Sequence, residues 1–497
     1  MNRRNFCQTS LAAATAAALF TSHRALAAML KVGGDVDAIT AAGQQSTLQR
    51  AAVQELSDSL RGPLLLPGNA AYDQARLVLN AAIDKHPALI VQPTGVADVG
   101  NAVDFARENQ LVVAVKCGGH STAGKSTCNG GMMIDLSRFR HVRVDPSEKV
   151  AYVSGGSLLG AMDHETMAHG LVTVAGTVSH TGIGGLTTGG GFGRLARRYG
   201  LSLDNVRALD VVSADGKVRH ASVEENQDLY WGVRGAGGNF GVVTNFEFDL
   251  HPMSRQVIAG NLFYPISRLR DALEFYAEFS LQSPDELATE LVFGYPAGGK
   301  PGFVLLALCY CGDPKNAERA MAAVKKLGKP MMGEIKSMDY VALQRSGDSD
   351  APRATASYLK GGFTSEIKQK LINAILDGLQ PHPGRSTQMI FQQAGGAIKR
   401  VPSDATAFAH RYAEHNMMAT VGWKPGAPRD EHVGYIKSYW QTLAPYTYGF
   451  YVNEADEDNA AITDKNYQGN YPRLLGIKRR YDPDNIFRLN ANIRPGG

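Results

Sequence analysis

The most constraining feature of this sequence is a run of glycines, GIGGLTTGGGFG, at positions 182–193. Residues without a Cβ atom allow backbone N–H groups to come close to a flat or anionic ligand. The run belongs to a glycine-dense block that extends from Gly155 to Gly241. Bulky apolar residues interleave with the glycines, namely Ile183, Leu186, Phe192 and Leu195. We therefore predict a buried segment that contacts a cofactor, and not a flexible surface loop.

The spacing of these glycines differs from the dinucleotide-binding fingerprint G-x-G-x-x-G. It contains Gly-x-Gly-Gly, no predicted strand runs directly into it, and no acidic residue ends a second strand about 20 residues further on. A Rossmann-type site is therefore not expected.

A second glycine motif, GHSTAGKS at Gly119–Ser126, formally matches the phosphate-binding pattern G-x-x-x-x-G-K-[ST]. That pattern must open a helix whose N-terminus faces the phosphates. Here it runs into Cys128-Asn129-Gly130-Gly131, which favours a turn. We interpret the match as a coincidence, reject an ATPase, and expect Lys125 to be a solvated loop residue.

The N-terminus has the pattern of an export signal. Arg3-Arg4-Asn5-Phe6 precedes an apolar stretch, Leu11 to Phe20, and Ala25-Leu26-Ala27 is a cleavage pattern. The twin arginine is typical of a Tat signal, and the apolar stretch is too short to span a bilayer. Removing residues 1–27 removes three arginines and no acids, so the net charge falls from +4 to +1. We predict a periplasmic or secreted protein with no membrane span and no nucleic-acid partner.

The chain has five cysteines, one of them (Cys7) in the predicted signal. The spacing of the other four is not that of a zinc site, and no metal is expected. In an oxidising compartment Cys117 and Cys128 could pair, but the sequence alone leaves this open.

At 497 residues the chain is long enough for two domains. The first part alternates helices and buried strands, and Asp215-Gly216 indicates a hairpin within Ala208–Ser222. After His251-Pro252 long helical stretches alternate with strands. The expected elements are helices at 97–109, 158–169, 266–279 and 316–326, and strands at 111–117, 132–137, 150–155 and 302–311.

Four stretches in combination resemble a known family. They are PALIVQPTGVADVGNAVDFARENQLVVAVKCGGHS, GTVSHTGIGGLTTGGGFGRLARRYGLSLDNV, GGNFGVVTNFEF and, near the C-terminus, NYPRLLGIKRRYDPDNIF. In this order they resemble the berberine-bridge-enzyme-like FAD-linked oxidases of the vanillyl-alcohol-oxidase superfamily. The resemblance covers roughly Pro87 to Pro252 and Tyr446 to Pro495.

The resemblance implies an α+β fold with a PCMH-type FAD-binding domain made of two separate pieces. A substrate domain with an antiparallel sheet, covered by helices on one side, would lie between them. The expected boundaries are a signal at 1–27, the first FAD-binding part at 28–255, the substrate domain at 256–445 and a returning segment at 446–497.

The resemblance also assigns cofactor-binding residues. His120 matches the histidine that is bonded to the flavin 8α-methyl group, and the cysteine that makes a second bond in some members is replaced by Val178. FAD attached by a single covalent link is therefore expected. The other residues implied are Val115, Gly118, Gly119, Ser121, His180, Thr181, Gly182, Gly185, Gly189, Gly190, Gly193, Asn239, Gly241, Val243, Asn453 and Asn490.

An oxidase of this class moves a hydride from a substrate carbon to flavin N5, while a base accepts the proton of the adjacent O–H or N–H. Seven of the 17 residues from Tyr435 to Tyr451 are aromatic, and about half are expected to be ordinary core. The resemblance to sugar-oxidising members points to Tyr451 as the base, with Tyr448 beside it. Alkaloid-oxidising members carry a glutamate in the segment matching GGAIKRVPSDATAF, where this chain has only Asp404.

The expected partners are a small-molecule substrate and O2, or another electron acceptor. A sugar or an aromatic alcohol is the favoured substrate, and a heteroaromatic amine stays open. Two alternatives remain: a dehydrogenase on the same fold that uses a quinone or a cytochrome, and a non-catalytic exported flavoprotein that binds a small aromatic ligand.

Overall fold

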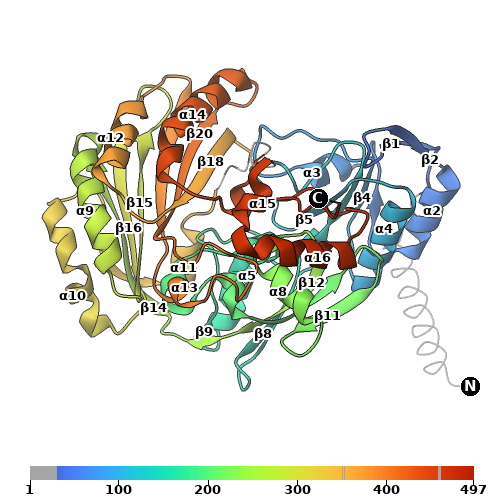
Figure 1. The fold of residues 1–497 in the computed structure, drawn as a ribbon, viewed down its shortest axis with the longest axis horizontal. Helices are drawn as coiled ribbons and strands as arrows, with labels where there is room; N and C mark the ends of the chain where they lie inside the picture. Colours follow the sequence, from blue (N-terminus) through green and yellow to red (C-terminus); the bar gives the residue numbers. More distant parts are fainter. Residues whose placement is uncertain (1–30, 350, 352, 457–460, 497) are drawn as a thin grey trace, which may run out of the picture.

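The computed structural model describes residues 31–349, 351, 353–456 and 461–496. The predicted signal, residues 1–27, lies outside the described residues. The described part is an α+β fold with three main sheets, of four, five and seven strands (Figure 1), which confirms the predicted fold class. No helix in these ranges is long and apolar enough to cross a membrane.

The first sheet is small and mixed, with the order β3-β4-β6-β5. Its strands β4 and β5 both pair in parallel with β6, and helix α4 connects β4 to β5. Apolar side chains cover both faces of this sheet, which explains why its strands are continuous apolar runs. The elements are β3 Leu64–Leu65, β4 Leu89–Val91, β5 Val113–Lys116, β6 Met132–Asp135, α2 Arg50–Ser59, α3 Tyr72–Arg76 and α4 Val96–Glu108.

The second sheet is antiparallel, with the order β11-β10-β12-β8-β7. The predicted hairpin is confirmed as β10 and β11, and Gly216 in its turn has a φ of +70°, which favours glycine. Helices α5, α8 and α16 pack on this sheet. The elements are β7 Val142–Asp145, β8 Val150–Ser154, β10 Val206–Val212, β11 Val218–Ser222, β12 Val242–Asp249, α5 Leu159–Met167, α8 Gln227–Ala236 and α16 Tyr471–Tyr481.

The third sheet has seven antiparallel strands in the order β17-β14-β16-β15-β19-β20-β18. Its alternating apolar residues pack under α9, α12 and α14 on one face (Figure 1). The elements are β14 Gln256–Pro265, β15 Leu287–Tyr295, β16 Phe303–Tyr310, β17 Lys336–Asp339, β18 Ala356–Thr364, β19 Arg385–Gln393, β20 His415–Trp423, α9 Leu269–Gln282, α10 Ala317–Met321, α12 Gln369–Gly378 and α14 Arg429–Leu443.

The opposite face of the third sheet turns toward the rest of the molecule. Val257 and Ala259 of β14 share a buried cluster with Phe192 of the glycine run and with Leu195, which follows the run. The antiparallel sheet with its main helices on one side is as predicted. The domain boundaries at 28–255, 256–445 and 446–497 remain predictions.

Two elements differ from the sequence expectations. The glycine run contains a short helix, α6 Ile183–Gly189, which was not predicted because glycine disfavours helices. The helix predicted at 316–326 is divided into α10 and a 3₁₀ helix, Ala322–Leu327. The smaller elements are β1 Val36–Ile39, β2 Gln45–Leu48, β9 Leu171–Val172, β13 His251–Pro252, α7 Ala196–Tyr199, α11 Tyr340–Arg345, α13 Ala397–Arg400 and α15 Thr463–Asn466.

The C-terminal segment contains a buried ion pair whose lysine binds the turn between α8 and β12. Lys478 and Asp482 are 2.6 Å apart, and both side chains are completely buried. The Lys478 ammonium also donates to the carbonyl oxygens of Asn239 (2.8 Å) and Phe487 (2.9 Å). Asp482 accepts from the backbone N–H groups of Ile486 and Phe487. Because every charge is paired and hydrogen-bonded, the ion pair can hold the tail in one position.

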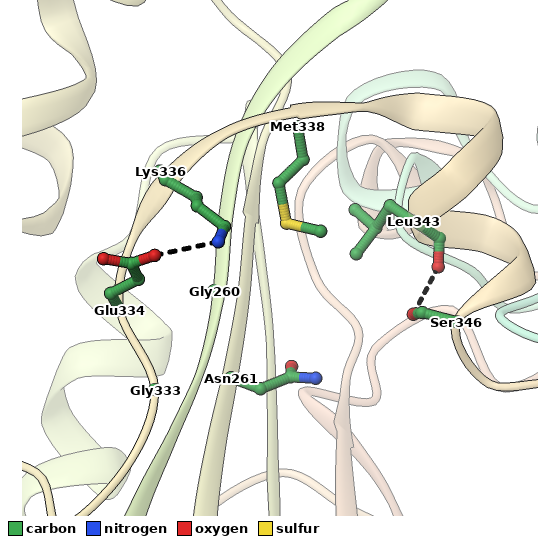
Figure 2. Close-up of a pocket in the computed structure, with 8 residues that line it drawn as sticks. All are labelled: Gly260, Asn261, Gly333, Glu334, Lys336, Met338, Leu343 and Ser346. Carbon is green, nitrogen blue, oxygen red and sulfur yellow. Dashed lines mark hydrogen bonds and ion pairs between the residues drawn. The ribbon is translucent and has the colours of Figure 1, made fainter.

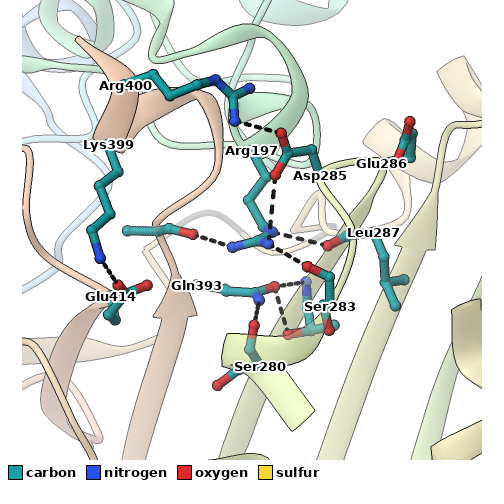
Figure 3. A network of polar contacts seen from close by, with 12 residues as sticks. Arg197, Ser280, Ser283, Asp285, Glu286, Leu287, Gln393, Lys399, Arg400 and Glu414 are labelled. Atoms are coloured by element: carbon teal, nitrogen blue, oxygen red, sulfur yellow. Dashed lines mark hydrogen bonds and ion pairs between the residues drawn. The ribbon is translucent and has the colours of Figure 1, made fainter. Parts of the chain in front are cut away.

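A second buried connection joins α7, which follows the glycine run, to the third sheet (Figure 3). Arg197, on α7, donates to the carbonyl oxygens of Leu287 (3.2 Å), Ala394 (2.6 Å) and Ser283 (2.8 Å). Asp285 lies 4.0 Å away and also pairs with Arg400. The guanidinium therefore fixes the glycine run relative to β15 and β19.

Candidate functional site

A cavity of about 430 Å³ lies where the first two sheets, the tail and the third sheet meet. Its walls come from the loop after β5, the segment around α6, the turn between α8 and β12, and the tail. Among the residues predicted from the sequence, those that line it are Val115, Gly118, Gly119, His120, Ser121, Thr181, Gly182, Gly185, Gly241, Val243, Tyr451, Asn453 and Asn490.

Two of these glycines, both in the cavity lining, lie against each other. A Cβ atom on Gly118 would lie 2.3 Å from the backbone nitrogen of Gly182, and a Cβ atom on Gly182 would lie 2.3 Å from that of Gly118. The loop after β5 and the start of α6 can approach this closely only because neither residue has a side chain.

The loop that resembles a phosphate-binding motif does not open a helix. Residues 121–131 form turns and bends, which agrees with the rejection of an ATPase site. Lys125 differs from expectation, because it lines the cavity and its ammonium donates to the carbonyl oxygen of Asn490 at 3.2 Å. The loop is therefore tied to the tail across the cavity.

His120 is paired with His180. Nε2 of His120 lies 2.6 Å from Nδ1 of His180, and its Nδ1 lies 3.4 Å from the hydroxyl of Thr181. Burial, and then the neighbouring His180, lowers the pKa of His120 to about 4. His120 is therefore neutral at physiological pH, the form in which an imidazole is nucleophilic.

His180 itself does not line the cavity. It is bound by the segment between α11 and β18. The backbone N–H of Ser349 donates to its Nε2 at 3.3 Å. The adjacent Ser179 is bound by the carboxylate of Asp348, through its backbone N–H at 2.8 Å and its hydroxyl. His180 therefore contacts His120 from outside the cavity lining, and its contact with FAD remains a prediction.

The tail contributes a polar wall. The hydroxyl oxygen of Tyr451 accepts hydrogen bonds from the backbone N–H of Gly191 and from the amide of Asn453, both at 2.8 Å. The Asn453 amide also donates to the carbonyl of Leu186 at 3.2 Å. Burial raises the pKa of Tyr451 above its usual value, so its phenol is protonated at neutral pH.

Three predicted glycines pack against neighbouring residues and do not line the cavity. A Cβ atom on Gly189 would lie 2.3 Å from Asn453 Oδ1, and one on Gly190 would lie 2.9 Å from the ring of Tyr451. A Cβ atom on Gly193 would lie 1.6 Å from the carbonyl oxygen of Ala175. These glycines therefore allow the tail and the run itself to pack closely.

Asn239 and Tyr448 also lie outside the cavity lining. Asn239 is completely buried; its amide donates to the carbonyl of Ala491 at 3.0 Å, and its Oδ1 accepts from the N–H of Ile493 at 3.0 Å. Tyr448 packs beside His410 and Phe363. Asn239 thus holds the tail in place, and Tyr448 packs against the hydrophobic cluster that contains Tyr451 without lining the cavity.

The two cysteines that the sequence left open are free thiols. Burial raises the pKa of Cys117 to about 11 and that of Cys128 to about 12, so both stay protonated and unreactive at neutral pH.

Several residues of the cavity lining were missed by sequence reasoning. Gly237 and Gly238 precede the predicted Asn239, and Glu454 follows the predicted Asn453. Their positions next to predicted residues were the available signal. Leu359, on β18, carried no such signal, because only the tertiary structure brings β18 to the cavity.

The residues present fit an FAD molecule. A Cβ atom on Gly185, Gly237 or Gly238 would meet nothing within 4 Å, so the cavity is open along these backbones. Ser126 Oγ and Asn490 Oδ1 are buried without a hydrogen-bond partner, which calls for a polar ligand. No group of three or more metal-ligating side chains occurs in the part of the chain described.

A second hollow, of about 470 Å³, lies over β14 and β17 (Figure 2). Its charged side chains pair with each other, since Lys336 donates to Glu334 at 2.8 Å. Ser346 likewise donates to the carbonyl of Leu343 at 2.6 Å. None of the predicted site residues lines it, so the first cavity is the candidate functional site.

Comparison with known proteins agrees with this geometry. A family described as "FAD binding domain" matches residues 87–222, and one described as "Berberine and berberine like" matches residues 450–494. These two matches contain most of the cavity lining.

Similar proteins extend over nearly the whole chain. An FAD-linked oxidoreductase of Dictyostelium discoideum is 33% identical over 89% of this chain and 97% of its own length. The (R)-6-hydroxynicotine oxidase of Paenarthrobacter nicotinovorans is 28% identical (88% and 98%), and the chitooligosaccharide oxidase of Gibberella zeae is 28% identical (90% and 95%). The crystal structure of 6-hydroxy-D-nicotine oxidase from Arthrobacter nicotinovorans superimposes with a TM-score of 0.79, at 28% identity, over 88% and 98%.

Fold, cavity and relatives together define a flavin-dependent oxidoreductase. The chain belongs to the berberine-bridge-enzyme-like FAD-linked oxidoreductases.

The contact between Gly118 and Gly182 yields a direct prediction. We expect Gly118→Ala to lose most of its bound FAD and to melt at a lower temperature, because overpacking of this kind costs about 1–3 kcal/mol. The matched control is Gly434→Ala on the exposed side of α14, where a Cβ atom meets nothing within 4 Å. The control is expected to keep its FAD and to gain up to about 1 kcal/mol of stability. The flavin-to-protein absorbance ratio and the melting temperature test this, and full FAD content in Gly118→Ala would contradict it.

Proposed function

We propose that the protein is an exported FAD-dependent oxidase that oxidises a carbon bearing a hydroxyl or amine group in a small molecule. The carbon loses a hydride, the adjacent O–H or N–H loses a proton, and a double bond forms between carbon and heteroatom. Bound FAD supplies the hydride acceptor, N5, and its reoxidation by O2 gives H2O2. The observation that carries this proposal is the single cavity in which the glycine backbones, His120 and the polar wall of the tail meet.

Each wall of the cavity has a task in this reaction. The backbone around Gly118 and Gly119 would hold the pyrophosphate without a lysine, since N–H groups there are not covered by side chains. Tyr451 and Asn453 form a wall whose mutual hydrogen bond fixes both side chains. Such fixed polar groups orient a substrate in an otherwise apolar cavity.

We further propose that FAD is attached covalently through His120 alone. Three features support this proposal: the position of His120 in the cavity lining, its low pKa, and the contact of its Nε2 with His180. That contact leaves Nδ1 as the ring nitrogen for a bond to the flavin 8α-methyl group. Val178 stands where a second, cysteinyl bond would need a thiol.

A sugar or an aromatic alcohol is the proposed substrate, and O2 the proposed electron acceptor. Two of the relatives are named as oxidases, one of a hydroxynicotine and one of chitooligosaccharides. Both names describe small polar molecules. They support the proposed class of reaction and do not single out one compound as the substrate.

The oxidase proposal is tested by mixing the oxidised holoenzyme, without oxygen, with chitooligosaccharides, cellooligosaccharides, benzylic alcohols and hydroxylated pyridine amines. At least one compound is expected to bleach the flavin absorbance, and air should then restore it with one H2O2 per flavin. Bleaching that air does not reverse, but a quinone does, would indicate a dehydrogenase. A flavin that no compound bleaches would support a binding protein without catalysis.

The covalent link is tested by acid precipitation of the purified protein. The wild-type pellet should stay yellow, and its flavin-binding peptide should contain His120. His120→Ala should give a white pellet and a yellow supernatant, because its flavin is released. An equally yellow His120→Ala pellet would reject the attachment through His120.

Export is tested by expression of the full chain in a bacterium with a Tat system. The exported protein is expected to begin at Ala28, and replacement of Arg3 and Arg4 by lysine should retain the precursor in the cytoplasm. Uncleaved wild-type protein that begins at Met1 in the cytoplasm would contradict this proposal.

A further inference from the structure

The cavity contains a buried carboxyl group that has no role in the proposed function. Glu454 ends the 3₁₀ helix Val452–Glu454 of the tail and lines the cavity. Its Oε1 accepts a hydrogen bond from the side-chain amide of Asn416, on β20, at 2.9 Å. Its Oε2 is buried and has no hydrogen-bond partner. A buried acceptor without a donor is unfavourable, so a ligand that supplies a donor there is favoured.

The third sheet holds this carboxyl group from a second side. A Cβ atom on Gly361, in β18, would lie only 2.6 Å from Oε2 of Glu454. The glycine therefore makes room for the carboxyl group, while Asn416 on the adjacent strand fixes its orientation. Leu359, two residues before Gly361, lines the same cavity. The third sheet thus fixes the position of the Glu454 carboxyl group, while its Oε2 has no hydrogen-bond partner.

Burial raises the pKa of Glu454 to about 8, against the opposing effect of the hydrogen bond from Asn416. The ionisable groups on the strands and the tail segment that pack against Glu454 do not provide a strong counter-ion for its carboxylate. On β18, Lys360 is paired with Asp456 at 2.9 Å, and on β20, burial lowers the pKa of His415 to about 3. In the tail, the charge of Glu454 contributes to the raised pKa of Tyr451. Lys125 lines the cavity too and donates to Asn490.

Tyr451 is less suited to accept a proton than Glu454. Its oxygen already accepts from Gly191 and Asn453, and its phenol stays protonated at neutral pH because burial raises its pKa. It can donate a hydrogen bond into the cavity and so position a substrate oxygen. The assignment of Tyr451 as the base, made from the sequence, is therefore the weaker of the two.

We infer that Glu454 is the proton acceptor of the oxidation. Oε2 takes the proton from the substrate O–H or N–H as the hydride leaves the adjacent carbon for the flavin. The electron pair of the broken O–H or N–H bond becomes the second bond between carbon and heteroatom, and the proton remains on the carboxyl group. This inference rests on the proposed oxidase function and adds that the substrate must present an O–H or N–H at Glu454.

The test is the rate constant of flavin reduction, measured without oxygen by rapid mixing between pH 5.5 and 9.5. It uses the substrate found to bleach the flavin. In the wild type, the rate constant is expected to rise about tenfold per pH unit and to level off near pH 8, because only ionised Glu454 accepts a proton. Glu454→Gln keeps the shape but cannot accept the proton. It should lower the rate constant roughly 10²–10⁴-fold and remove the rise.

Three further variants separate this role from a structural one. Glu454→Asp should restore part of the rate and keep a rise with pH, while Tyr451→Phe should slow reduction but keep the wild-type pH dependence. Glu366→Gln, which removes an exposed carboxylate, should behave as the wild type. FAD content and melting temperature, measured for all variants, show whether each is folded.

The outcomes of these measurements distinguish a failure of the inference about Glu454 from a failure of the proposed oxidase function. If Glu454→Gln, with full FAD content, keeps both the wild-type rate and its rise with pH, Glu454 is not the acceptor although the oxidase function stands. If Tyr451→Phe loses the rise instead, the base is Tyr451. If no substrate reduces the wild-type flavin, the proposed function itself fails.

Discussion

The close contact between Gly118 and Gly182 is the constraint on which the site depends. It brings the loop after β5, from the mixed sheet, against the start of α6, which packs on the antiparallel sheet. Backbone N–H groups and the ring of His120 therefore reach the cavity directly. The same absence of side chains recurs at Gly193 against Ala175 and at Gly190 against Tyr451. Glycine thus serves two purposes here, to expose backbone to a ligand and to let backbone pack on backbone.

The tail completes the site because it is fixed at several buried points. Lys478, Asp482 and Asn239 form one fully buried group that holds the chain from α16 to Ile493. Removal of one partner from such an ion pair lowers the free energy of unfolding by about 3–5 kcal/mol, so the tail is firmly attached. Arg197 makes the corresponding connection between the glycine run and the third sheet. Both connections lie outside the cavity, and they determine where its walls stand.

Three polar groups of the cavity differ in their protonation state at neutral pH. His120 has a low pKa and is neutral, Tyr451 has a raised pKa and keeps its proton, and Glu454 is close to half ionised near pH 8. Burial is the largest cause in all three cases, and it disfavours the charged form each time. One physical effect therefore favours the uncharged form of the imidazole, the phenol and the carboxyl group, for which we propose three different roles. Their different roles follow from their chemistry and from their hydrogen-bond partners.

The sequence alone determined much of this protein. Apolar periodicity predicted helix α4 and the strands β5 and β6 of the first sheet, Asp215-Gly216 predicted the hairpin, and the turn after Ser126 excluded a phosphate-binding helix. These are local effects, since period, turn chemistry and helix propensity act over a few neighbouring residues. The family resemblance also predicted thirteen of the residues that line the cavity.

Only the tertiary structure decided which of these residues face the cavity. Gly185 lines it and Gly189 packs against the tail, although both belong to one run. Glu454 becomes a candidate catalytic group because Asn416 and Gly361 lie beside it, 38 and 93 residues away along the chain. Burial and hydrogen bonding between such distant residues set the pKa and the orientation of a side chain. A sequence shows which groups are present, and the packing of the three sheets and the tail decides which of them can react.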